Sequence, residues 1–162
     1  MSIILSGDGV ITGLTSTGIS AVQQLPAGTV KQVVSMTTAT ATSTSSSSWS
    51  ATNLTLSITP SNTANKILIL VNTALAGSIA GQPQLTVFRG ATNLGGGSSS
   101  AFVTNYFGGG GDWRPASISY LDSPATTSAT TYTVNVNSLA GSVTACLTQI
   151  TSTITLMEIS GT

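Results

Sequence analysis

Asp112 and Asp122, two of the chain's four carboxylates, lie close enough in the sequence to suggest paired acid and base chemistry. Glycosidases hydrolyse sugars with two carboxyl groups that flank the bound substrate. Each aspartate, however, stands among turn-forming residues, where a carboxylate more often caps the turn by accepting backbone hydrogen bonds. The chain has no histidine and a single cysteine, which excludes Ser-His-Asp and Cys-His catalysis and histidine-containing zinc sites. We predict no enzymatic activity, no metal and no cofactor.

The segment "GGGGDWRP", residues 108–115, carries the side chains best suited to bind a ligand. Trp113 offers an aromatic face that can stack on a sugar ring. Arg114 and Asp112 can form hydrogen bonds with the sugar hydroxyls. Tyr106 lies just before the glycine run, so these four residues are the candidate receptor contacts. In the alternative interpretation, Trp113 anchors the loop on the protein and Arg114 pairs with Asp112.

The elements that must position these residues are predicted to be strands. Charged residues make up only 5% of the 162-residue chain, which is rich in Ser, Thr, Val and Gly. The segment "NLTLSI", residues 53–58, alternates, so Leu54, Leu56 and Ile58 should face a core. We predict an all-β fold, an antiparallel, jelly-roll-like β-sandwich lobe over residues 29–162. The Thr/Ser run at 37–48 should be a flexible surface loop, followed by Trp49 as a core or interface anchor.

Two apolar segments indicate partners. The strand "KILILVNTA", residues 66–74, has no polar face, which makes Leu68 and Leu70 candidates for a subunit interface. Residues 1–28 should form a glycine-rich arm that cannot bury its own side chains, and we expect it to pack against sister chains or to anchor the lobe to the surface on which it sits. An ordinary first strand and loop is the alternative for this segment. The candidate anchoring residues of the arm are Ile3, Ile4, Leu5, Val10, Ile11, Leu14 and Ile19.

Charge and cysteine content restrict the other partners. The formal net charge is zero and the four basic residues are scattered, so we predict no nucleic-acid binding. The chain shows no amphipathic basic helix, lipidation signal, signal peptide or long apolar run, so we predict no membrane partner. Cys146 can form no internal disulfide and should be a small buried side chain. These features fit synthesis in a reducing cytoplasm.

Several phrases of the sequence are similar to small fibre-like virion proteins of tailed bacteriophages that infect aquatic bacteria and cyanobacteria. The phrases are "SGDGVITGLTSTGISAVQQLPAGTVKQVVS", "ITPSNTANKILILVN", "SISYLDSPATTSATTYTV" and "TITLMEIS", in this order along most of the chain. The resemblance implies a structural protein on the virion surface, made in the host bacterial cytoplasm. It implies a homotrimeric decoration protein or short fibre, in contact with capsid or tail proteins through the arm. The alternative is a tail-fibre-type protein that recognises host surface glycan.

Overall fold

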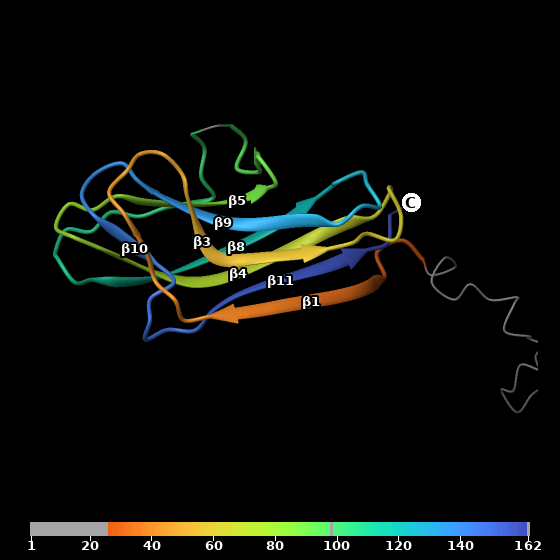
Figure 1. The fold of residues 1–162 in the computed structure, drawn as a ribbon, viewed down its shortest axis with the longest axis horizontal. Coiled ribbons are helices and arrows are strands. Elements are labelled where there is room, and N and C mark those ends of the chain that lie inside the picture. The colour runs from red at the N-terminus through yellow and green to blue at the C-terminus, as the bar shows by residue number, and fades with distance from the viewer. Residues whose placement is uncertain (1–25, 98, 162) are drawn as a thin grey trace, which may run out of the picture.

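The computed structural model describes residues 26–97 and 99–161, which contain strands and no helix (Figure 1). The predicted anchoring residues of the arm, from Ile3 to Ile19, lie outside the described residues. The strands of the described residues are β1 (Val30–Thr38), β2 (Thr42–Thr44), β3 (Ser50–Ile58), β4 (Lys66–Gly77), β5 (Pro83–Arg89), β6 (Thr92–Asn93), β7 (Val103–Thr104), β8 (Trp113–Asp122), β9 (Thr130–Ser138), β10 (Val143–Ala145) and β11 (Ser152–Ile159).

The strands form two antiparallel sheets that pack face to face (Figure 1). The first, called here the β4 sheet, has the order β1-β11-β4-β8, with short β10 and β2 extending it beside the end of β4. The second, the β9 sheet, has the order β3-β9-β5, with β6 and β7 both on the free side of β5. We leave β2 and β10 aside, count β6 and β7 as one strand, and renumber the resulting eight strands in chain order. The two sheets then have the strand orders 1-8-3-6 and 2-7-4-5. This arrangement is a jelly roll, which confirms the predicted fold class.

The core lies between the sheets and follows the alternation of the strands. Leu54 and Ile58 of β3 are buried as predicted, and they face the inner side chains of the β4 sheet such as Ile69. Tyr132 and Val134 line the same space from β9. Because successive side chains of a strand point to opposite faces, about half of the side chains of each strand lie on the outer faces of the sandwich.

The Thr/Ser run after β1 is more ordered than its composition predicts. β1 continues to Thr38, and β2 forms within the run because Thr42–Thr44 pairs with Val143–Ala145 of β10. The prediction of a flexible loop over 37–48 is therefore wrong for these residues. Threonine suits strands once a partner strand is present, and that partner lies about a hundred residues further along the chain.

Both outer strands of the β4 sheet carry features that discourage edge-to-edge pairing. Pro115 lies in β8, which among the described strands pairs only with β4, and proline offers no backbone N–H to a further strand. On the opposite edge, Lys31 lies where the register of β1 with β11 is irregular. Lysine and irregular register are common protections of sheet edges, so this sheet is better suited to contact a partner through its face.

Candidate functional site

Two of the predicted ligand contacts around "GGGGDWRP" lie on opposite faces of one strand. Trp113 and Arg114 are consecutive residues of β8, so their side chains leave opposite faces of the strand. The guanidinium of Arg114 lies 5.4 Å from the ring centre of Phe107, whose side chain is fully buried. Among the described residues no ion pair joins Arg114 to Asp112. Trp113 is 51% exposed, which does not fit the anchoring alternative either, and Tyr106 is 56% exposed.

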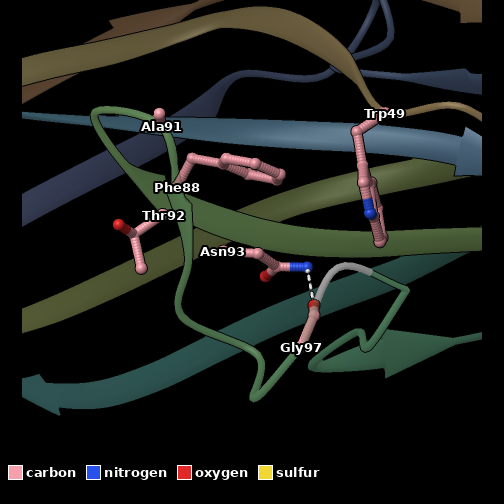
Figure 2. Close-up of a pocket in the computed structure, with 6 residues that line it drawn as sticks. All are labelled: Trp49, Phe88, Ala91, Thr92, Asn93 and Gly97. Carbon is pink, nitrogen blue, oxygen red and sulfur yellow. Dashed lines mark hydrogen bonds between the residues drawn. The ribbon is translucent and has the colours of Figure 1, made fainter.

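The chain's other tryptophan lies on the β9 sheet, beside a cavity of about 480 Å³ (Figure 2). Trp49 precedes β3 and packs edge-on against Phe88 of β5, with ring centres 6.2 Å apart. The sequence suggested only an anchor here, since nothing in it shows that the segment after β6 folds back to face Trp49. The sequence signal that could have indicated a site here is a large aromatic side chain, Trp49, directly after a long run of small Ser and Thr residues.

The outer face of the β4 sheet carries an apolar row that crosses four strands. We call this row the outer apolar band: Val33 of β1, Met157 of β11, Leu68 of β4 and Leu121 of β8, each directly opposite the next in register. Val33 is 53% exposed and Leu121 is 47% exposed, while Leu68 and Met157 are half-buried. Leu70 lies one row further, where its register partners Thr155 and Ser119 are polar. The two predicted interface leucines thus share one exposed face, whereas their strand neighbours Ile67 and Ile69 are buried.

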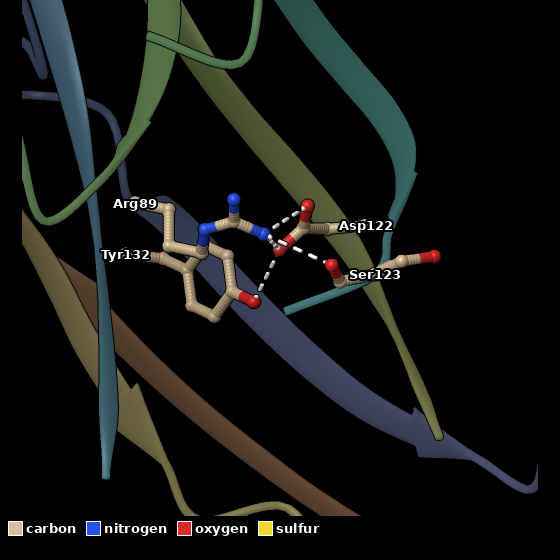
Figure 3. Close-up of polar contacts among 4 residues, drawn as sticks. All are labelled: Arg89, Asp122, Ser123 and Tyr132. Atoms are coloured by element: carbon tan, nitrogen blue, oxygen red, sulfur yellow. Dashed lines mark hydrogen bonds and ion pairs between the residues drawn. The ribbon is translucent and has the colours of Figure 1, made fainter. Parts of the chain in front are cut away.

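Asp122 is a polar link between the two sheets and not a turn cap (Figure 3). Arg89 at the end of β5 donates from Nη1 to both carboxylate oxygens, at 2.8 and 2.9 Å, and Tyr132 of β9 donates its hydroxyl at 2.7 Å. Arg89 also donates to the backbone oxygen of Ser123. Burial and the hydrogen bond to Asp122 raise the pKa of Tyr132 far above its ordinary value, so the hydroxyl stays protonated. The prediction that Asp122 caps a turn is wrong, and its role here is structural.

Glu158 is the second buried carboxylate, at 1% exposure on the inner side of β11. It accepts hydrogen bonds from the Gln32 side chain, the backbone N–H and hydroxyl of Ser61, and the Asn65 amide. Burial alone raises a carboxyl pKa, but these donors outweigh it and lower the pKa of Glu158 below 4.5. An ionised carboxylate therefore fastens β1, β11 and the turn after β3 together at one end of the sandwich.

Within residues 26–97 and 99–161, no three His, Cys, Asp or Glu side chains gather closely enough to hold a metal ion. No helix in this part of the chain is long and apolar enough to cross a membrane. Cys146 is fully buried, as predicted for a small apolar side chain.

Comparisons with known proteins find matches among solved structures. No protein-family model matches the chain, and no curated protein matches it either. A chain in the structure of infectious bursal disease virus, Gx strain, superposes on 80% of this chain with 12% sequence identity and a TM-score of 0.42. The present chain covers 38% of the length of that neighbour.

Proposed function

We propose that the protein is a non-enzymatic structural protein of a tailed-phage virion, either a homotrimeric decoration protein or a short fibre. The N-terminal arm would attach it to a capsid or tail protein, and the jelly-roll lobe would lie on the particle surface. Support for the virion role comes from the sequence phrases that are similar to phage fibre-like proteins. The two buried carboxylates, Asp122 and Glu158, support a structural role, because each is enclosed by donors that stabilise the sandwich.

The outer apolar band is the observation that carries the proposed self-association. Soluble monomers rarely keep a continuous apolar row half exposed, and symmetric homo-oligomers are the usual way to cover one. Each half-exposed Val or Leu would contribute about 1 kcal/mol if a second copy covered it. Because Pro115 and the irregular register at Lys31 discourage pairing of the sheet edges, copies would meet through this face.

Sedimentation equilibrium of the full chain tests the self-association. We expect three times the chain mass of 16.2 kDa at micromolar concentration. A double change of Leu68→Lys and Leu121→Lys places two charges within the band and should yield monomers. Ser117→Lys, on the same face of β8 but outside the band, is the matched control and should remain trimeric. A wild-type chain that sediments as a monomer would contradict the proposal.

The attachment to virions needs a separate test. Deletion of residues 2–24 should abolish incorporation of the protein into particles, whereas the lobe should still fold. Stoichiometric incorporation of the shortened chain would show that the arm is not the anchor. Electron microscopy of particles carrying a labelled lobe would then decide between a position on the head and one on the tail.

A further inference from the structure

The outer face of the β9 sheet is covered by polypeptide, although outer faces of sandwiches ordinarily meet water. Thr86 of β5 and Asn135 and Asn137 of β9 point away from the core, yet they are 0%, 9% and 2% exposed. The segment before Trp49 lies over the end of β9, because the Asn137 amide donates to the backbone oxygen of Ser47 at 3.0 Å. The segment after β6 lies over β5. Between these two coverings the structure has an open pocket.

The pocket has aromatic and uncharged walls (Figure 2). Trp49 stands on one side, and the segment that ends at Gly97 forms the opposite side. Its volume of about 480 Å³ lies within the range of sites for small molecules. The lining residues are Trp49, Phe88, Ala91, Thr92, Asn93 and Gly97.

One wall is held in place by a single amide side chain. Asn93 Oδ1 accepts hydrogen bonds from the Thr86 hydroxyl at 2.6 Å and from the backbone N–H of Gly95 at 2.9 Å. Its Nδ2 donates to the backbone oxygens of Gly97 and Ser100, at 2.7 and 2.8 Å. A side chain at Gly95 would collide with the Ser100 oxygen, 2.7 Å from where its Cβ would lie. The wall is therefore shaped before any ligand binds, which lowers the entropic cost of binding.

Among the described residues, three amide oxygens without hydrogen-bond donors lie on the same outer face but are not part of the pocket lining. Asn135 Oδ1, Asn137 Oδ1 and Gln84 Oε1 are buried, and no group among the described residues donates to them. In the ladder of β5 and β9, Gln84 lies opposite Asn137, and Asn135 lies between that pair and Phe88. A buried acceptor without a donor is unfavourable. Because each of these oxygens is closed off from solvent, a ligand in the pocket would contact the lining side chains and not these oxygens.

We propose that this pocket binds a neutral saccharide. The faces of Trp49 and Phe88 suit the C–H groups of a sugar ring, and Thr92 and Asn93, which also line the pocket, place polar groups beside them. None of the described residues that line the pocket is charged, so an uncharged sugar fits better than an acidic one. The site goes beyond the proposed structural role and does not depend on it. It also differs from the site predicted around Trp113, which lies in β8 of the β4 sheet.

The two tryptophans of the chain make a matched test. In full-length Trp113→Phe, Trp49 is the only indole, and its emission should change saturably with neutral oligosaccharides. The probes are gluco-, galacto-, manno- and N-acetylhexosamine oligosaccharides at millimolar concentration. Saturation-transfer NMR should show the dissociation constant of the best probe raised about tenfold or more by Trp49→Ala and unchanged by Trp113→Ala. Thermal unfolding of each variant checks that the fold is intact, and Trp49→Phe should keep part of the affinity.

The proposal is overturned if none of these oligosaccharides binds saturably. It is equally overturned if Trp49→Ala and Trp113→Ala bind the probe as the wild type does. Binding of an apolar dye without any oligosaccharide would indicate a protein-docking pocket and would also count against it. The proposed virion role would survive each of these results, because particle incorporation is measured independently.

Discussion

Replacing Asp122 with alanine should weaken the link between the two sheets and lower the stability of the whole sandwich. Asp122 ends β8 in the β4 sheet, whereas its partners Arg89 and Tyr132 lie opposite each other in the β9 sheet (Figure 3). Removal of the carboxylate leaves the Tyr132 hydroxyl without an acceptor among the described residues and leaves Arg89 with only the backbone oxygen of Ser123. The fold should persist, because the apolar core between the sheets is not touched by this change.

The expected loss follows from how deeply each donor is buried. Tyr132 is fully buried, and a buried hydroxyl without a partner costs about 1–3 kcal/mol. The side chain of Arg89 is 30% exposed, so water can replace part of its lost ion pair, which adds about 1 kcal/mol. Together these give a loss of about 2–4 kcal/mol, short of the penalty for a fully buried pair. For a chain of this length, the Tm should fall by about 5–15 °C.

Urea unfolding of the full chain, followed by circular dichroism, measures this loss. Tyr132→Phe removes only the hydroxyl and should cost about 1 kcal/mol, since the carboxylate keeps Arg89. The double variant should lose less unfolding free energy than the two single variants lose in total, because both changes remove the same hydrogen bond. An Asp122→Ala chain within about 0.5 kcal/mol of the wild type would refute the reasoning.

The remaining predictions concern acid stability and packing. The pKa of Glu158 is lower in the folded chain than its ordinary value of 4.5. The ionised carboxylate therefore stabilises the fold above that pH, and this stabilisation is lost as the pH falls through the pKa of the folded chain. Urea unfolding of Glu158→Gln should therefore show a smaller loss of stability between neutral and acid pH than the wild type; equal losses would contradict this. Gly77→Ala places a Cβ 2.5 Å from the Phe107 ring and should cost about 1–3 kcal/mol of unfolding free energy. Gly108→Ala, with no atom within 4 Å of its Cβ, is the control and should be near neutral.

Features set by short stretches of sequence could be predicted, and features that depend on distant pairing could not. The alternation around Leu54 and the apolar character of Leu68 identify strands and an exposed sheet face from the sequence alone. The partner of Asp122 could not be identified, because Arg89 lies 33 residues earlier in the chain and on the other sheet. Nearby turn residues suggested a local cap instead. The Trp49 pocket was missed for the same reason, since its opposite wall takes shape only when Asn93 binds the following segment.

The two outer faces of the sandwich are suited to different tasks. The outer apolar band on the β4 sheet is partly exposed to solvent and runs across four strands, which suits a contact between copies. The β9 sheet is instead covered by loops, with the aromatic pocket at Trp49 and Phe88 between them. Because the sheets of a sandwich face in opposite directions, copies joined through the band would turn their pockets outward. A self-associating virion protein and a saccharide site are therefore compatible in one lobe, and a change in Leu68 should leave the Trp49 pocket intact.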